Sequence, residues 1–148
     1  MFLTKQDLSA TVYPEIVALM SRYTDVVIEM NFNLAEGDLQ SYLASRYDIG
    51  AELAKEGADR NAYLLSLAIT LAIYYLYTLQ ETIPAHRTKM YDQAIAVLGL
   101  IRDGKQTLPG VDPAPTPESP VLGQIGYGSN ARRPSLVASF PGNSRTPV

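Results

Sequence analysis

Hydrophobic residues recur at spacings of three and four along residues 24–48. The series consists of Ile28, Phe32, Ala35, Leu39, Tyr42 and Leu43. Positions with this spacing fall on one face of an α-helix, which has about 3.6 residues per turn. The pattern therefore predicts one long amphipathic helix, with a bend at Gly37, where glycine costs about 1 kcal/mol of helix stability.

Residues 62–79, AYLLSLAITLAIYYLYTL, contain no charged residue. A membrane-spanning helix needs about 20 predominantly apolar residues, whereas this run has 18 and includes Ser66, Thr70, Thr78 and four tyrosines. A helix that is apolar nearly all round is instead buried on every side, so we expect the central helix of a bundle. A bundle this small rarely covers one helix completely, which predicts that another subunit covers part of its surface.

Local signals predict a capped helix at the start of the chain. Thr4 is a good N-cap, and Asp7 at the third helical position favours the positive end of the helix dipole. Leu3 and Leu8 have the spacing of a hydrophobic staple across that cap. Pro14 is suited to start a short second helix.

Cap residues also divide the middle of the chain. Asp48 is an N-cap for a short helical turn over residues 51–56, which Gly57 is expected to close. The charge-free helix begins soon afterwards, and either Asp59 or Asn61 provides its N-cap.

Pro84 starts a last predicted helix, and Gly104 ends it. The residues expected on its inner face are Met90, Ala94, Val97, Leu98 and Ile101. No segment of residues 1–104 alternates between apolar and polar positions for long, as a half-buried strand would. The predicted fold class is therefore all-α, a bundle of four to five helices over residues 1–104.

Composition changes at residue 105. Residues 105–148 hold eight of the ten prolines and five of the ten glycines, which predicts an extended C-terminal arm. Two apolar runs, residues 121–127 and 135–140, are unlike a purely disordered tail and indicate docking on a partner, for example by strand addition. The expected partner-contact residues are Leu122, Ile125, Tyr127, Arg132, Arg133, Leu136 and Phe140.

Charge and cysteine content exclude several classes of protein. The net charge of −3 is small, which argues against a general nucleic-acid binder. The absence of cysteine excludes disulfides, thiolate metal sites and a cysteine nucleophile. The first residues, MFLTKQDL, lack the apolar segment of a signal peptide, so none is expected.

Candidate chemical motifs are weak. Residues 126–131, GYGSNA, have dinucleotide-loop spacing, but Arg132, Arg133 and Pro134 follow where a helix must begin. His86 is the only histidine, too few for a zinc site without cysteine. The acidic residues that an acid/base pair would need are expected on solvated helix faces; they are Glu29, Glu36, Asp38, Glu52 and Glu56. We therefore expect no catalytic residues, no cofactor and no metal.

The order of four segments resembles a known family. The segments are MFLTKQDL at residues 1–8, YLASRYD at 42–48, DRNAYLLSLAITLAIYYLY at 59–77 and MYDQAIAVLGLIRDGKQTLPGV at 90–111. Together they resemble a small helical protein encoded among the head genes of Mu-like phages and prophages. That protein is similar to the head–tail connector, or adaptor, proteins of long-tailed phages. The residues that match the family motifs include Arg46, Tyr47, Asp59, Arg60 and Asn61, and the resemblance assigns none of them a catalytic role.

The resemblance implies a structural virion protein that is not an enzyme. Such a subunit forms a ring, commonly twelve-fold, between the portal protein and a downstream neck or tail-completion protein. It is located in the virion neck, and in the host cytoplasm during assembly. DNA passes through the ring without specific binding, and no membrane is involved. The long arm after Val111 departs from the compact pattern of the family.

Two other classes of function stay open on the sequence alone. One is a small regulatory binding module, such as an antitoxin or adaptor, whose C-terminal tail folds on a partner. The other is a small helical enzyme, which the lack of a convergent group of polar residues disfavours. Neighbouring genes discriminate these classes, because portal and capsid genes indicate a connector and a toxin gene indicates an antitoxin.

Overall fold

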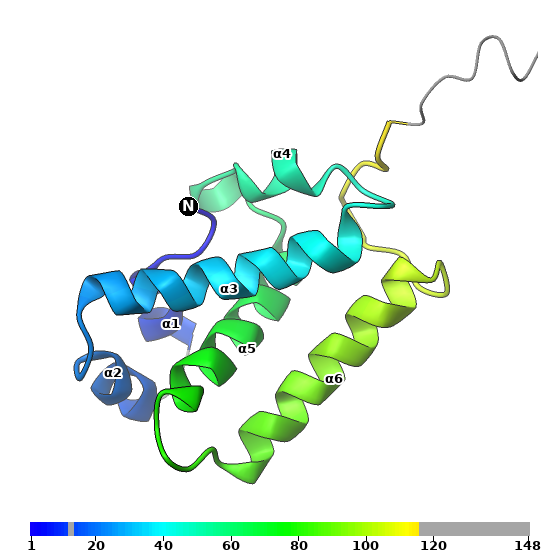
Figure 1. Cartoon of the computed structure of the whole chain (residues 1–148). Helices are drawn as coiled ribbons and strands as arrows, with labels where there is room; N and C mark the ends of the chain where they lie inside the picture. Colours follow the sequence, from blue (N-terminus) through cyan, green and yellow to red (C-terminus); the bar gives the residue numbers. More distant parts are fainter. Residues whose placement is uncertain (12–13, 116–148) are drawn as a thin grey trace, which may run out of the picture. The chain divides into compact units, whose positions relative to one another are not determined.

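The charge-free segment forms α5 (Ala62–Thr78), at the centre of a helical unit (Figure 1). The structure is a computed structural model that describes residues 1–11 and 14–115. Four helices contact α5, and they are α1 (Lys5–Thr11), α2 (Pro14–Met20), α3 (Asp25–Leu43) and α6 (Ala85–Arg102). In the described part of the chain, α4 (Ile49–Leu53) and a 3₁₀ turn, η1 (Gly57–Asp59), complete the helices, and no strand is present. The all-α prediction is confirmed.

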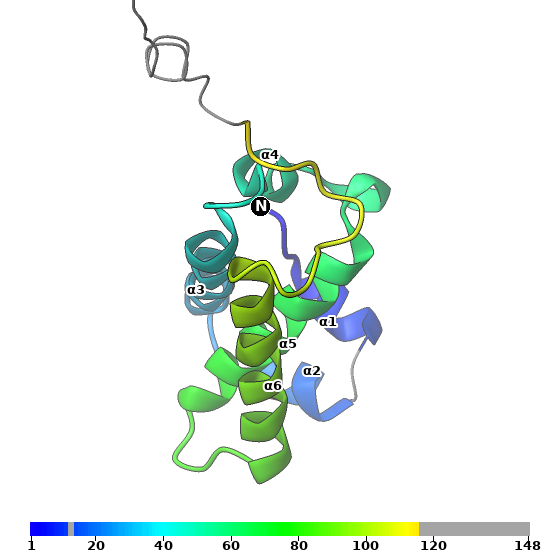
Figure 2. The same ribbon diagram turned by 90° about the vertical axis from the view of Figure 1, so that its right-hand side faces the viewer.

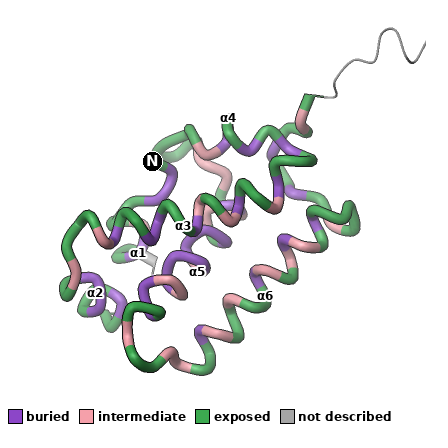
Figure 3. Tube along the Cα trace, in the orientation of Figure 1, coloured by how far each residue is buried: buried purple, intermediate pink, exposed green. Residues whose placement is uncertain are grey.

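Most residues of α5 are buried or partly buried along the whole length of the helix (Figure 3). Its exposed residues are only Ala62, Ser66 and Thr78. The two short N-terminal helices add to the cover that α3 and α6 provide. Leu79, at the end of the predicted segment, is 41% exposed and Leu65 is partly buried, so cover by another subunit stays a prediction. Among residues 1–11 and 14–115, no helix combines the length and hydropathy of a bilayer-spanning segment.

The predicted caps at the start of the chain are present. The Asp7 backbone N–H donates to Thr4 Oγ1 at 3.3 Å, and the Thr4 N–H donates to Asp7 Oδ2 at 2.8 Å. This reciprocal pair is a capping box with aspartate as its acidic member. Leu3 and Leu8 are both fully buried, as a staple requires.

Asp48 and Asn61 are N-caps as predicted, and they begin α4 and α5. Of the two candidate N-caps of α5, Asp59 and Asn61, the structure shows Asn61, whose Oδ1 accepts a hydrogen bond from the Leu64 N–H at 2.9 Å. Gly57 has the left-handed φ of +61°, but it does not close α4. The C-cap of α4 is Ala54, and Gly57 instead begins η1, because α4 is shorter than the predicted turn.

The buried face of α6 matches the prediction except at one residue, Met90. Ala94, Leu98 and Ile101 are buried, and Val97 packs partly buried against the core. Met90 was expected on this inner face, but it is 41% exposed. At this end of α6, Arg87 and Tyr91 face α5 instead, over Tyr77 and Tyr74. Gly104 ends the helix with φ +80°, and the Lys105 N–H donates to the Leu100 carbonyl at 2.9 Å, as in a Schellman motif.

Residues 105–115 return across the end of the bundle near α4 (Figure 2). Leu108 and Val111 are buried in the core. The backbone pairs with the segment after α3, because the Ala114 N–H donates to the Arg46 carbonyl at 2.9 Å and the Asp48 N–H donates to the Asp112 carbonyl at 3.2 Å. The part of the arm before residue 116 is therefore packed on the helical unit.

Candidate interaction surfaces

The seven predicted partner-contact residues lie outside the described residues. They are Leu122, Ile125, Tyr127, Arg132, Arg133, Leu136 and Phe140. The GYGSNA segment, residues 126–131, lies outside them as well. The structure therefore describes candidate surfaces only on residues 1–11 and 14–115.

His86 is exposed in the first turn of α6, where no acidic residue accompanies it. Within the described ranges, no three His, Cys, Asp or Glu side chains gather closely enough to hold a metal ion. Arg87, the next residue, is 6% exposed. Its guanidinium lies over the Tyr77 ring at 5.8 Å, and its Nε has no hydrogen-bond partner in the described part of the chain. The sequence pattern gave no sign of this buried cation.

Acidic residues expected on solvated faces have mixed environments. Glu29 and Glu56 are exposed as expected. Glu52 is only 4% exposed and pairs with Lys55 at 2.7 Å, so its predicted exposure is wrong. Its partner is three residues away on the same turn, and this neutralises its charge locally. Glu36 and Asp38 are partly buried.

Asp38 accepts a 2.5 Å hydrogen bond from Tyr75 Oη. Burial, followed by this hydrogen bond, raises the pKa of Tyr75 above its ordinary value. Tyr91 of α6 stacks on Tyr74 with ring centroids 4.0 Å apart and meets Tyr75 edge-on. The three rings and Asp38 therefore link α3, α5 and α6.

Arg60 and Asp7 form an ion pair that fixes the N-terminal segment. Two guanidinium nitrogens, Nη1 and Nη2, each lie 2.8 Å from an Asp7 carboxylate oxygen, and both side chains are 12% exposed. Arg60 also donates to the carbonyls of Phe2 at 2.6 Å and Gly57 at 3.0 Å. The hydrogen bonds from Arg60 hold the pKa of Asp7 below its ordinary value, against the opposing effect of burial.

Tyr47 and Asn61 hold residues 105–115. Tyr47 Oη accepts from the buried Leu108 N–H at 2.9 Å. Asn61 Nδ2 donates to the Pro109 carbonyl at 2.7 Å. Gly110 follows with φ +75°, and a Cβ there would lie 2.9 Å from Asn61 Nδ2, so only glycine fits. Tyr47 and Asn61, which match the family motifs, therefore have structural roles.

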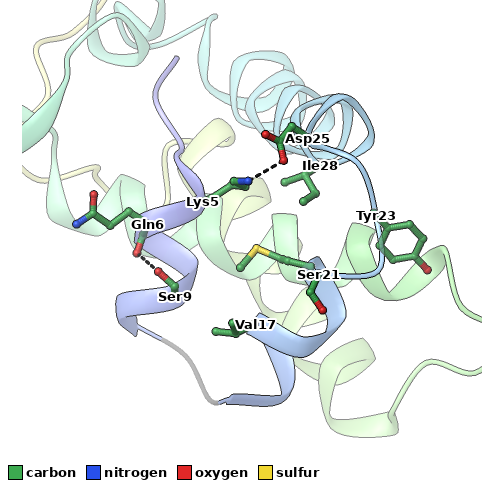
Figure 4. Close-up of a pocket in the computed structure, with 9 residues that line it drawn as sticks. Lys5, Gln6, Ser9, Val17, Ser21, Tyr23, Asp25 and Ile28 are labelled. Carbon is green, nitrogen blue, oxygen red and sulfur yellow. Dashed lines mark hydrogen bonds and ion pairs between the residues drawn. The ribbon is translucent and has the colours of Figure 1, made fainter.

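A pocket of about 430 Å³ lies between α1, α2 and the start of α3 (Figure 4). Val17 and Ile28 line it, and the Lys5–Asp25 ion pair, 2.7 Å long, lies at its edge. Its two serine hydroxyls donate to backbone carbonyls of their own helices, Ser9 to Gln6 at 3.0 Å and Ser21 to Ala18 at 2.8 Å. No histidine lines this pocket to activate a hydroxyl.

The outer face of α3 carries an apolar stripe, which we define as Val26, Met30 and Leu34. Their exposed fractions are 67%, 60% and 54%. Spacings of four residues place them on one side of the helix. The core residues Ile28, Phe32 and others occupy the opposite side, so α3 is apolar on two faces. Glu29 is exposed beside the stripe.

These features define an all-α protein with an exposed apolar stripe on α3. The sequence matches the family described as Bacteriophage Mu, Gp36 over residues 2–125, and the chain belongs to this family of phage proteins. No curated protein and no solved structure matches the chain. The suspected relationship to Mu-like phages is thus confirmed at the level of the family.

Proposed function

We propose that this chain is a structural virion protein, a head–tail connector subunit that forms a ring between the portal and the tail. The observation that carries this proposal is the membership of a phage family over residues 2–125. The proposal assigns the protein no enzymatic activity, cofactor or metal. Its place is the virion neck, after assembly in the host cytoplasm.

A rigid subunit suits this role, because a ring must transmit fixed geometry from one component to the next. Arg60 ties the N-terminal segment to the start of α5. Tyr47 and Asn61 tie residues 105–115 to the segment after α3 and to the start of α5. A ring also needs two different surfaces on each subunit, since head-to-tail contacts generate closed rings. The apolar stripe on α3 is one surface available for such contacts.

The proposed partners are other copies of the chain, the portal protein and a downstream neck or tail-completion protein. We take a twelve-fold ring as the working stoichiometry, with DNA passing through it unread. Because residues 105–115 pack on the helical unit, the docking role falls to residues 116–148, which include all seven predicted contact residues.

The test is deletion of the gene from a phage that encodes it, followed by electron microscopy of lysates. The expected result is separate heads and tails, with joining restored by the gene in trans. Imaging of the purified protein, alone and with portal, should show rings. Complete infectious particles without the gene, together with absence of the protein from purified wild-type particles, would refute the proposal.

A further inference from the structure

The stripe on α3 is the largest group of exposed large apolar side chains on any one described helix. Val26, Met30 and Leu34 are all more than half exposed, although the same helix buries its opposite face completely in the core. A helix with two apolar faces normally lies between two layers. In the described chain only the inner layer is present, so the outer face needs an occupant.

The charge of α3 narrows the choice of occupant. The helix contains four acidic residues, Asp25, Glu29, Glu36 and Asp38, and no basic residue; Lys5 of α1 pairs with Asp25 at 2.7 Å, and Glu29 is exposed beside the stripe. Packing of two α3 helices from two copies would bring like charges together, which is unfavourable. An occupant with apolar side chains and positive charge is favoured instead.

The chain itself contains one segment of that chemistry. Residues 1–115 carry 9 basic and 14 acidic residues, whereas residues 116–148 carry 3 basic and 1 acidic. The second group has two apolar runs, residues 121–127 and 135–140, with Arg132 and Arg133 between them. Its 33 residues reach about 100 Å when extended, at roughly 3.3 Å per residue, which is enough to cross a neighbouring subunit.

We propose that residues 121–140 of one copy dock on the outer face of α3 of a neighbouring copy. The apolar runs cover Val26, Met30 and Leu34, and the arginine pair lies beside Glu29. This inference rests on the proposed ring, because the ring supplies the neighbour. It adds the surface that receives the segment.

The absence of cysteine makes disulfide trapping a clean test. Full-length single variants Leu34→Cys and Leu136→Cys, one carrying a mass tag, are mixed, allowed to assemble and mildly oxidised. The expected result is a mixed dimer joined between positions 34 and 136, identified by mass spectrometry. The matched control replaces Leu34→Cys by Leu100→Cys, an exposed leucine of α6, and should give little mixed dimer.

Other occupants give other products. A further variant carries both Leu34→Cys and Leu136→Cys in one chain. If a disulfide forms only within that single chain, the segment covers α3 of its own copy. If the main product is a dimer of Leu34→Cys with itself, the α3 helices of two copies pack together. Either result overturns the proposal, and so does the absence of any product involving position 34. Ring formation is scored separately by electron microscopy. Rings without the mixed dimer overturn the docking alone, whereas absence of rings and of virion incorporation counts against the connector function.

A substitution gives an independent measurement. Leu34→Glu places a carboxylate within the stripe and should weaken self-association about tenfold, a change of roughly 1.4 kcal/mol in binding free energy. Leu100→Glu, the matched control, should leave self-association unchanged. Circular dichroism of both variants verifies folding, which an exposed position tolerates. Equal self-association of the two variants would contradict the docking.

Discussion

Replacement of Arg60 by alanine should be among the most damaging single changes outside the core. The substitution removes two 2.8 Å bonds to Asp7 and two further bonds to backbone carbonyls. It also leaves the Asp7 carboxylate, 12% exposed, without its cation. Hydrogen bonds to charged groups contribute about 1.5–3 kcal/mol each. Because such bonds are not additive and the site is partly hydrated, we expect a total loss of about 3 kcal/mol.

The assay is urea unfolding of the full-length protein followed by circular dichroism, with a thermal melt as a second measure. A loss of about 3 kcal/mol corresponds to roughly 10 °C in Tm for a unit of this size. Lys5→Ala is the control, because it breaks the Lys5–Asp25 pair, whose side chains are 50% and 73% exposed. An exposed pair contributes about 0–1 kcal/mol. If Arg60→Ala lost no more stability than this control, the reasoning from burial and bond number would fail.

The same ion pair predicts a pH dependence. The pKa of Asp7 in the folded protein lies below its ordinary value of 3.8, mainly because of hydrogen bonds from Arg60. The unfolded state therefore binds the proton first as the pH falls. The stabilisation is complete at pH values above the unfolded-state pKa and is lost as the pH falls through the folded-state pKa. The difference in free energy of unfolding between wild type and Asp7→Asn should shrink over this acidic range. A difference independent of pH would contradict the assignment.

Three further changes test other parts of the structure. Tyr47→Phe leaves the buried backbone N–H of Leu108 without its acceptor and should cost about 1–3 kcal/mol in urea unfolding; an unchanged midpoint would contradict this. A chain ended after Gly104 should melt lower than one ended after Pro115, because it lacks two buried apolar residues; equal Tm values would show that residues 105–115 contribute nothing. Arg87→Met should leave Tm unchanged or raise it. The reason is that the Nε of the buried guanidinium has no hydrogen-bond partner and no carboxylate pairs with it among the described residues. A large drop in Tm would contradict this expectation and indicate an essential partner of Arg87.

Local signals predicted local structure well. Thr4, Asp48 and Asn61 are N-caps, and Gly104 ends α6, because each of these roles depends on groups within a few residues along the chain. The buried face of α3 followed from periodicity in the same way, although Tyr42 is only partly buried.

Errors arose where burial depends on distant neighbours. Met90 has the right spacing for the inner face of α6, but it is exposed because Arg87 and Tyr91 are the residues that face α5 at that end of the helix. Two short helices near the N-terminus cover part of α5, and the spacing of residues within α5 did not indicate them. Glu52 is buried and pairs with the exposed Lys55, which spacing alone did not indicate. Periodicity identifies a face but does not say which element covers it.

Four of the residues that match the family motifs have structural roles. The resemblance therefore indicates the fold more clearly than it indicates a functional site. The Arg46 carbonyl, Tyr47, Arg60 and Asn61 each hydrogen-bond to a segment at least 48 residues away in the sequence. Their role is to close the helical unit, so they carry little information about partners. A second periodic series on α3, Val26, Met30 and Leu34, lies on the exposed side of the helix, and this series is the surface used in the docking that we propose. A helix that keeps apolar side chains on its outer face, with no basic residue anywhere along it, is better explained by a basic apolar partner segment than by the needs of the isolated subunit.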